Sequence, residues 1–282
     1  MKWYKSPAKI NRFLFIKSKL ENGYHEIVTL FEKIDFFDTI GIELTNNSKG
    51  HISLKCPDWL PKGPKNLVYR AAQCFLDYTK KDFSIYIELE KNIPSGGGLG
   101  GGSSNCATTL KALNELSGFL LKESELLKIA GMLGADCPFF ITNWVSALGT
   151  GTGVNLEKVE ITRPYFYVLI FPDFSVSTKW AYENFELTTS RYETIFEPRK
   201  GYLDEIWEND LEKPVCSRYP IIQELKGQLI KLGAKAALMS GSGSTIFGVF
   251  ETEAKASMAK EAIVQNTKFD CLLTRTLDIK SL

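Results

Sequence analysis

Six of the seven residues from 96 to 102 are glycine, and this run is the part of the sequence best suited to chemistry. Residues without side chains expose backbone N–H groups and let a ligand approach the main chain closely. The whole segment reads Pro94-Ser95-Gly96-Gly97-Gly98-Leu99-Gly100-Gly101-Gly102-Ser103-Ser104-Asn105. Backbone donors that precede a helix favour an anionic ligand such as phosphate. The sequence therefore predicts a phosphate-binding loop.

The segments on both sides of the loop have clear periodicity. Residues 83–90 alternate between apolar and polar side chains, as in a half-buried strand. Residues 106–116 place apolar side chains at helical spacing, and Ser103 or Ser104 would be a natural N-cap for that helix. We therefore expect the order strand, glycine loop, helix.

Three other interpretations of the loop are weaker. A P-loop ends in a Lys-Ser/Thr pair, but no lysine follows the glycines before Lys111. A dinucleotide-binding fingerprint is matched by glycines 96, 98 and 101, although so many adjacent glycines make such a match almost automatic. The acid that this fingerprint needs about 20 residues later would be Glu115, which lies inside the helix. A flexible linker would lack the flanking strand and helix. A nucleoside triphosphate loop of another kind is therefore favoured.

The loop resembles the phosphate-binding motif of the GHMP superfamily of small-molecule kinases, which includes galactokinase, homoserine kinase and mevalonate kinase. The motif P-x-x-x-G-L-G-S-S-A-A is followed here, with extra glycines, by Pro94, Gly98, Leu99, Gly100, Ser103 and Ser104. Further segments resemble family motifs and occur in family order, at residues 7–11 with 22–31, 134–140 and 239–244. The longer loop and the segment around Tyr24 are similar to one branch of the superfamily, whose acceptor alcohol is joined to cytidine diphosphate. Arg12, Asn22 and Cys137 depart from the pattern of that branch, which usually has leucine, aspartate and valine there.

The resemblance implies an α+β protein with the two-domain GHMP kinase fold. Residues 1–152 would form a ribosomal-protein-S5-domain-2-like N-terminal domain, and residues 153–282 a ferredoxin-like C-terminal domain. The second half agrees, because its expected elements follow the order β-α-β-β-α-β: strand 165–171, helix 221–232, strands 235–239 and 245–250, helix 253–264 and strand 269–274. Residues 188–214 are expected to form an irregular helical insertion.

Two charged residues acquire a catalytic role from the same resemblance. It implies that Asp136 is the base that accepts the proton of the acceptor hydroxyl, and that Lys9 stabilises charge on the transferred phosphoryl group. From the residues alone, Asp136 is equally an N-cap of a short helix that follows it, and Lys9 an ordinary solvated lysine. Lys9 belongs to a strand expected over residues 8–16, one face of which is made by Lys9, Asn11, Phe13 and Phe15.

The remaining site residues are implied by the resemblance as well. The phosphates of ATP would be bound by Pro94, Ser95, Gly96, Gly97, Gly98, Leu99, Gly100, Gly101, Gly102, Ser103 and Ser104. The acceptor substrate would contact Asn11, Tyr24, His25, Tyr182, Gly241, Ser242 and Gly243. An aromatic ring offers a platform on which a base stacks, and Trp180 and Phe185 are alternatives to Tyr182 for this role. The turn at residues 241–243 closes over the ligand or is only a tight connection between two strands.

Composition limits the remaining possibilities. The 282 residues are 44% hydrophobic and 24% charged with a formal net charge of +1, which offers no bulk attraction to nucleic acid or acidic membranes. No apolar run reaches the roughly 18 residues of a membrane span. Six scattered cysteines without a C-x-x-C pair, with only two histidines, argue against a zinc site and for thiols in a reducing compartment. Because the motifs begin at Pro7, we expect no leader peptide and a cytoplasmic protein.

We therefore expect a kinase that transfers the γ-phosphate of ATP, with Mg²⁺ for charge compensation, to an alcohol that carries cytidine diphosphate. The resemblance implies that this step belongs to the non-mevalonate route to isoprenoid precursors. Two alternatives stay open: a kinase of the same superfamily with another acceptor alcohol, and a non-catalytic nucleotide-binding module on a kinase fold. The sequence does not indicate the protein ligands of the metal or the oligomeric state.

Overall fold

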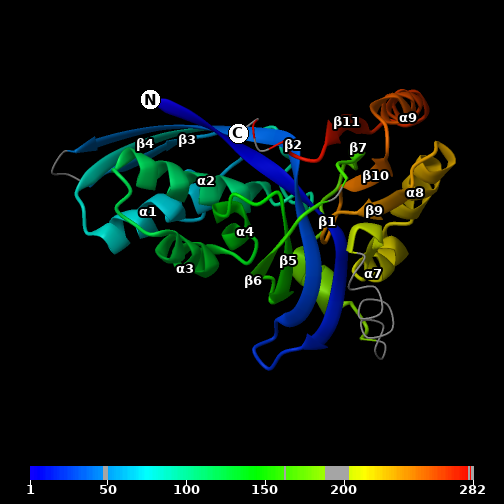
Figure 1. Ribbon diagram of the computed structural model, residues 1–282, viewed down its shortest axis with the longest axis horizontal. Helices are drawn as coiled ribbons and strands as arrows, with labels where there is room; N and C mark the ends of the chain where they lie inside the picture. Colours follow the sequence, from blue (N-terminus) through cyan, green and yellow to red (C-terminus); the bar gives the residue numbers. More distant parts are fainter. Residues whose placement is uncertain (47–49, 162, 188–202, 279, 281–282) are drawn as a thin grey trace.

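A computed structural model describes residues 1–46, 50–161, 163–187, 203–278 and 280 (Figure 1). The strands of this described part form two sheets, one of seven strands and one of four. The first sheet has the order β3-β4-β2-β1-β8, with β5 paired to β2 and β6 paired to β5. Its strands are β1 (Lys2–Lys19), β2 (His25–Asn46), β3 (Ile52–Lys55), β4 (Phe83–Glu90), β5 (Ser146–Gly151), β6 (Asn155–Val159) and β8 (Glu208–Asn209).

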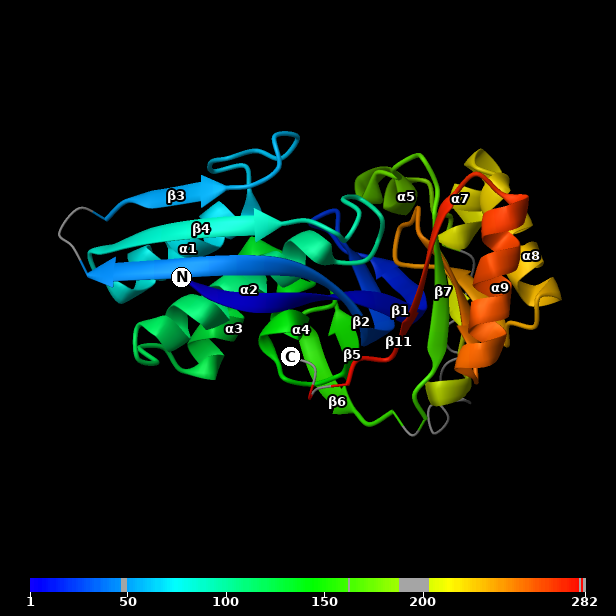
Figure 2. The same cartoon turned by 90° about the horizontal axis from the view of Figure 1, so that it is seen from above.

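A long antiparallel hairpin of β1 and β2 connects the two halves of the molecule (Figures 1 and 2). One face of β1 carries Ala8 and Ile10, which are buried in a cluster with Tyr167 and Phe247 of the second sheet. Leu99 of the glycine loop is buried in the same cluster. Because burying an apolar side chain of this size contributes about 1.5–3 kcal/mol, this shared core attaches the loop firmly to both halves.

A β-bulge in β1 changes which side chains face the site. The register with β2 shifts between Asn11 and Phe13, so that Arg12 is the extra residue. Such an insertion reverses the alternation of the strand beyond it. Leu14 therefore lines the same cavity as Lys9 and Asn11, described below. The expectation that Phe13 and Phe15 share the face of Lys9 is wrong, and both pack instead in a separate cluster with Val28, Leu30 and Ile206.

Four helices cover one face of the first sheet (Figure 2). They are α1 (Leu67–Thr79), α2 (Gly101–Leu116), α3 (Glu123–Leu133) and α4 (Cys137–Ile141). Asn66, a residue type common at N-caps, caps α1: its Oδ1 accepts a hydrogen bond of 2.9 Å from the backbone N–H of Val68. Helix α3 ends before Gly134, a residue type common at helix C-termini.

The start of α2 differs from the sequence-based prediction. The helix begins at Gly101, and its N-cap is Gly100 in a left-handed conformation with φ of 68°. Ser103 and Ser104 lie inside the first turn and do not cap the helix. A Cβ atom at Gly101 would lie 2.9 Å from Cγ2 of Ile93, so the chain enters the helix where only glycine fits without displacing a neighbour.

The second sheet has the strand order β11-β7-β10-β9, and every neighbouring pair in it is antiparallel. Its strands are β7 (Phe166–Phe171), β9 (Ala236–Met239), β10 (Ile246–Phe250) and β11 (Asp270–Arg275). The helices of this half are α5 (Thr178–Glu183), α7 (Glu212–Arg218), α8 (Ile221–Lys231) and α9 (Glu253–Asn266). Helices α8 and α9 lie beside one face of the sheet (Figure 2). The order and pairing are those of a ferredoxin-like unit, as predicted.

The expected insertion at residues 188–214 lies partly outside the described residues, which resume at residue 203. From there the chain forms the 3-10 helix η1 (Leu203–Glu205), then β8, and then the start of α7. The expected division into residues 1–152 and 153–282 stays a prediction. Because β6 pairs with β5 of the first sheet, we propose that the boundary lies a few residues later, between β6 and β7.

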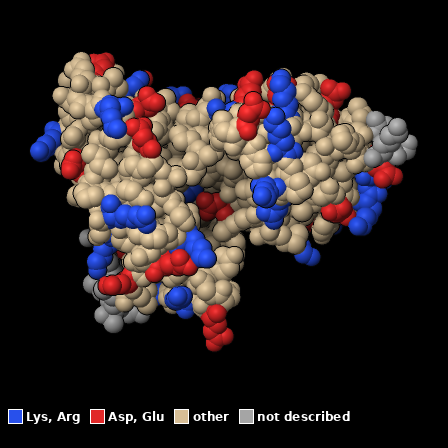
Figure 3. Space-filling model, turned by 180° about the vertical axis from the view of Figure 1, so that it is seen from behind, with Lys and Arg blue, Asp and Glu red and all other residues tan. Residues whose placement is uncertain are grey.

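Charges of both signs are interspersed on the face seen from behind, and this face is hollowed between the two halves (Figure 3). Among the described residues, no helix has the length and apolar character needed to cross a bilayer.

Candidate active site

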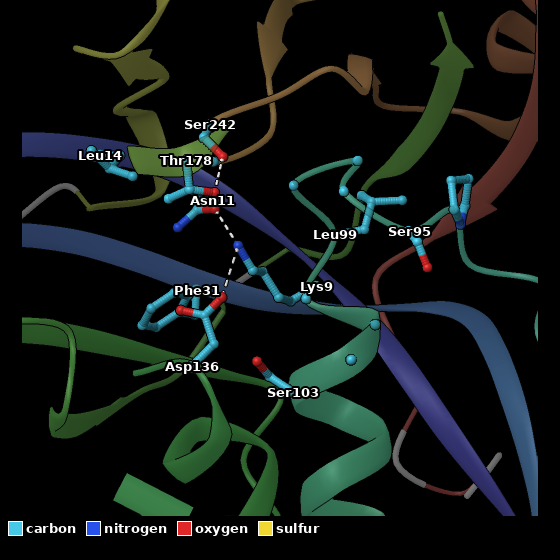
Figure 4. Close-up of a pocket in the computed structure, with 18 of the residues that line it drawn as sticks. Lys9, Asn11, Leu14, Phe31, Ser95, Leu99, Ser103, Asp136, Thr178 and Ser242 are labelled. Carbon is cyan, nitrogen blue, oxygen red and sulfur yellow. Dashed lines mark hydrogen bonds and ion pairs between the residues drawn. The ribbon is translucent and has the colours of Figure 1, made fainter. Parts of the chain in front are cut away.

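A cavity of about 330 Å³ lies along the glycine loop and is lined by residues from both halves of the molecule (Figure 4). The loop contributes residues 94–103. The other lining residues are Lys9, Asn11, Leu14, Ile27, Phe31, Leu67, Asp136, Thr178, Tyr182, Gly241 and Ser242. The loop and the two charged residues predicted for catalysis therefore meet in one place.

Two glycine turns pack directly against each other at this cavity. Gly98 has φ of 76°, and a Cβ atom there would lie 1.9 Å from the backbone oxygen of Ser240. The hydroxyl of Ser240 donates a hydrogen bond of 3.0 Å to the backbone oxygen of Gly98. The backbone N–H of Thr245 donates to the oxygen of Gly97 over 3.2 Å. The turn between β9 and β10 thus holds the glycine loop from the other half of the molecule.

The side chains of Lys9 and Asp136 face each other across the cavity (Figure 4). Lys9 Nζ lies 3.5 Å from Asp136 Oδ2 and donates a hydrogen bond of 2.7 Å to Asn11 Oδ1. The lysine is 3% exposed, and its backbone N–H donates to the oxygen of Leu99 in the glycine loop. Asn11 is held in turn, because its amide nitrogen donates to Thr29 Oγ1 over 2.8 Å. The ammonium group therefore has a defined position between an amide and a carboxylate.

Asp136 occupies the N-cap position of α4, as one interpretation of the sequence expected. Its side chain accepts no capping hydrogen bond from that helix. The carboxylate points instead to Lys9, and its side chain is one-third exposed on the cavity side. A carboxylate that is both ion-paired and accessible is placed to receive a proton from a bound ligand.

The aromatic residues predicted for the site differ in whether they reach the cavity. Tyr182 lines the cavity, and its ring stacks on that of His25 with 5.1 Å between the ring centroids. Burial, followed by the charge of Asp136, raises the pKa of Tyr182, so the phenol stays neutral. Tyr24 is 62% exposed at the tip of the hairpin. Neither Trp180 nor Phe185 lines the cavity. Of Tyr182, Trp180 and Phe185, the three rings considered for base stacking, only Tyr182 therefore lines this cavity.

Two other predicted site residues are not brought to the cavity surface. Ser104 is fully buried, and its hydroxyl accepts a hydrogen bond of 2.8 Å from Ser6 Oγ. Gly243 completes the turn below Gly241 and Ser242, where its N–H donates to the oxygen of Ser240 over 2.9 Å. The turn at residues 241–243 is therefore both a tight connection and, through its first two residues, part of the cavity wall.

Sequence reasoning missed Asp38, which orders the entrance of the glycine loop. Its fully buried carboxylate accepts hydrogen bonds from the backbone N–H groups of Asn92 and Ile93 over 2.8 and 2.9 Å. It also accepts from the side chain of Asn105 over 2.9 Å and pairs with Lys91. A carboxylate inside the apolar run of β2 was a signal for such a role, since buried charges occur where partners satisfy them.

Thr178 and Asn209 were missed as well. The hydroxyls of Thr178 and Ser242 lie 2.8 Å apart on the cavity wall (Figure 4). Asn209 of β8 donates from its amide nitrogen to the backbone oxygens of Met239 and Gly241 over 2.8 and 2.7 Å. Because β8 is part of the first sheet, the side chain of Asn209 connects the turn between β9 and β10 to that sheet. Neither contact has a sequence signal, because each joins segments far apart in the chain.

Family models match both halves of the chain. Residues 66–143 match the model of the GHMP kinases N terminal domain, and residues 197–268 match that of the GHMP kinases C terminal region. The crystal structure of homoserine kinase from Cytophaga hutchinsonii has a TM-score of 0.72 and 19% identity, and the match covers 95% of this chain and 94% of that one. These findings define the class of the protein, and the predicted two-domain GHMP kinase fold is confirmed.

More similar proteins narrow the class. A protein of Syntrophotalea carbinolica named 4-diphosphocytidyl-2-C-methyl-D-erythritol kinase is 42% identical over 93% of this chain and 94% of its own length. A protein of Citrifermentans bemidjiense with the same name is 40% identical, over 96% of this chain and 98% of its own. The crystal structure of a 4-(cytidine 5'-diphospho)-2C-methyl-D-erythritol kinase has a TM-score of 0.81 and 32% identity, covering 98% of this chain and 100% of that one. The chain belongs to this family of GHMP kinases.

Proposed function

We propose that the protein transfers the γ-phosphoryl group of ATP to the 2-hydroxyl of 4-diphosphocytidyl-2-C-methyl-D-erythritol, in the non-mevalonate route to isoprenoid precursors. The observation that carries the proposal is the meeting of Lys9, Asp136 and the glycine loop in one cavity. Membership of the family supports the choice of acceptor. We place the reaction in the cytoplasm on the grounds of the cysteine usage described above.

The glycine loop is suited to the phosphates of ATP. Gly96, Gly98 and Gly100 all have positive φ, a backbone shape in which successive N–H groups form a concave anion-binding surface. Helix α2 begins at Gly101 and adds the positive end of its dipole. A smaller cavity of about 130 Å³ shares Leu67, Ser95 and Gly102 with the first and is the candidate place for part of the nucleoside end of ATP.

In the proposed reaction, a bond forms between the acceptor oxygen and the γ-phosphorus while the bond from that phosphorus to the bridging oxygen of ADP breaks. The hydroxyl proton passes to the carboxylate of Asp136, which also orients the attacking oxygen. A carboxylate accepts such a proton late, as the transition state loosens. Lys9 stabilises negative charge on the transferred group and, together with Asn11, keeps the carboxylate in position.

Mg²⁺ fits this site if phosphate oxygens supply most of its ligands. The described residues contain no cluster of three or more acidic, histidine or cysteine side chains that could hold a metal ion by themselves. Mg²⁺ at phosphates commonly uses only one or two protein oxygens. The hydroxyl of Ser103 lines the same cavity and is the candidate here. The ion would neutralise charge on the phosphates.

The cytosine of the acceptor has a candidate place beside Tyr182. Stacking of a base on an aromatic ring contributes about 1–3 kcal/mol in single-stranded nucleic acid complexes. The ring of His25 lies against Tyr182, and burial followed by the charge of Lys19 lowers the pKa of His25, so a neutral imidazole is favoured there. A neutral ring stacks and hydrogen-bonds without adding charge to the base site.

A substrate panel tests the proposal. The purified protein is incubated with ATP and Mg²⁺ and either 4-diphosphocytidyl-2-C-methyl-D-erythritol, homoserine or mevalonate, and the products are analysed by mass spectrometry. We expect a product heavier by one phosphate only with the cytidine-linked alcohol, and competition by CMP. Turnover of another acceptor without inhibition by CMP would support a different GHMP kinase. ATP binding without turnover of any acceptor would support a non-catalytic module.

A further inference from the structure

A second cavity of about 720 Å³ lies in the first half of the molecule and shares no described lining residue with the glycine-loop cavity. It is enclosed by the beginning of β1, by α2 and α3, and by α4. A volume of this size is typical of sites for small organic molecules. None of the proposed steps of phosphoryl transfer uses a residue of this cavity.

Two lysines in this cavity are held by uncharged oxygens. Lys33 of β2 is 3% exposed, and its Nζ donates a hydrogen bond of 2.6 Å to the backbone oxygen of Thr142. The Nζ of Lys111, on α2, donates to Asn143 Oδ1 over 2.8 Å. Among the described residues, no carboxylate oxygen lies within 4.0 Å of either nitrogen. An ammonium group has three N–H donors, and each lysine uses one of them for an oxygen. The Nζ of Lys33 also lies over the ring of Phe139, 4.8 Å from its centroid, which leaves a further donor for a ligand.

The electrostatics of this pair favour an added negative charge. Burial, followed by repulsion from Lys111, lowers the pKa of Lys33 to about 7. Burial also lowers the pKa of Lys111, although Glu123 acts in the opposite direction. The buried ammonium group of Lys33 is unfavourable without a carboxylate beside it, and an anion that enters from solvent would supply that countercharge.

The rest of the cavity wall combines apolar and charged side chains, which favours a ligand with an apolar part and a charged part. Apolar surface comes from Trp3, Leu121, Leu126, Phe140 and Ile141. The other charged or titratable groups facing the cavity are Lys2, Tyr4 and Lys5 of β1, Glu115 of α2 and Glu123 of α3. Lys2 and Glu115 form an ion pair with each other, so they add no net charge.

We propose that this cavity is a second ligand site, which binds a small organic phosphate with its anionic head between Lys33 and Lys111 and its apolar part against Trp3 and Leu126. Lysine ammonium groups bind phosphate as compact positive charges with several donors. The apolar walls provide burial for a hydrocarbon part, which inorganic phosphate lacks. The inference is independent of the proposed kinase reaction, because it uses none of its residues.

Isothermal titration calorimetry with hexyl phosphate as the probe tests the site. We expect hexyl phosphate to bind saturably. Inorganic phosphate, which lacks the apolar chain, and hexanol, which lacks the phosphate, should each bind with an affinity lower by about tenfold or more. The substitutions Lys33→Met and Lys111→Gln should each lower the affinity for hexyl phosphate by about tenfold or more. Lys128→Gln, on the exposed side of α3, is the matched control and should leave the affinity within about twofold.

Proton uptake gives a second readout. At about pH 8 the side chain of Lys33 is mostly neutral in the empty site, and a bound dianion raises its pKa. Titrations in two buffers of different ionisation enthalpy should show uptake of up to about one proton, which Lys33→Met abolishes while the melting temperature shows that the variant is folded. Absence of saturable binding overturns the proposal. So does binding that survives both lysine substitutions, because the phosphate would then lie elsewhere, for example at the glycine loop.

Discussion

At the scale of single residues, the site depends on where two charged groups are held. Lys9 is buried in β1 and has Asn11 and Asp136 as partners. A solvated lysine would sample many positions, whereas this one loses little further freedom when a phosphate arrives. The partly exposed Asp136 remains accessible to the acceptor. Lys9 is thus a buried cation and Asp136 an accessible carboxylate. This arrangement suits a reaction in which the lysine faces the phosphate and the aspartate faces the alcohol.

The substitution Asp136→Asn tests this arrangement. We expect kcat to fall by about 10²–10⁴-fold, because the amide cannot accept the hydroxyl proton. Affinity for ATP should change by less than about twofold, since we propose that the loop amides, and not Asp136, bind the phosphates. Steady-state kinetics and equilibrium binding of ATP measure the two quantities separately. A variant with near-normal kcat would show that Asp136 is not the base.

The substitution Tyr182→Ala tests the candidate base site. Loss of one stacking face should raise KM for the cytidine-linked substrate by about 5–150-fold, equivalent to about 1–3 kcal/mol, with KM for ATP unchanged. Trp180→Ala is the control, because Trp180 does not line the cavity and stacks under Arg218 instead. Equal effects of the two substitutions on KM would contradict a base site at Tyr182.

At the scale of elements, a turn from the other half of the chain supports the glycine loop. The turn between β9 and β10 contacts the loop through Ser240 and Thr245, and Asn209 anchors this turn to the first sheet. Asp38 fixes the other end of the loop through two backbone N–H groups. The glycine loop is therefore supported on both sides, which suits a cradle that must not rearrange during phosphoryl transfer.

The substitution Gly98→Ala should break this contact. The new methyl group would lie 1.9 Å from the oxygen of Ser240, at a residue with positive φ. We expect the free energy of unfolding to fall by more than about 2 kcal/mol and ATP affinity to fall by about tenfold or more. Gly131→Ala is the control, because the new Cβ in α3 lies 3.9 Å from its nearest neighbour and should stabilise the helix by about 0.5–1 kcal/mol. Denaturant titration and ATP binding compare the two, and a neutral Gly98→Ala would refute the close packing.

At the scale of the whole molecule, a buried polar network joins the two sheets. Arg12, the extra residue of the β1 bulge, lies over the ring of Trp207 with 4.4 Å between its guanidinium carbon and the ring centroid. Its Nη1 is 3.4 Å from Glu32 Oε2, and both side chains are fully buried. Oε1 of Glu32 accepts hydrogen bonds from Tyr167 of β7 and from Thr276 over 2.8 and 2.7 Å. The departure from leucine at residue 12 thus has a structural partner in Glu32.

Removing one donor of this network should lower stability without changing the chemistry. Tyr167→Phe deletes the hydroxyl that donates to Glu32, and we expect the free energy of unfolding to fall by about 1–3 kcal/mol. Burial, followed by the charge of Glu32, raises the pKa of Tyr167, so it donates as a neutral phenol at all ordinary pH values. Tyr78→Phe, on the exposed side of α1, is the control and should change stability by less than about 0.5 kcal/mol. A similar small effect of both substitutions would show that the network contributes little.

The sequence by itself determined the local elements and pointed to the candidate reactive groups. Periodicity and capping depend on near neighbours in the chain, so short stretches of sequence encode them. Examples are the alternation in β4, the Asn66 cap, the end of α3 at Gly134 and the β-α-β-β-α-β order. Family motifs pointed to Lys9, Asp136 and the loop for the same reason, since each motif is a continuous run.

Only the tertiary structure decided how those pieces meet. Three features depend on atoms from distant segments. They are the bulge at Arg12, the N-cap of α2 at the left-handed Gly100 three residues before Ser103, and the contact of Gly98 with Ser240. The roles of Asp38, Asn209 and Thr178 arise in the same way. The physical reason is that backbone register and side-chain contacts are chosen by packing of the whole chain, which local sequence preferences do not contain.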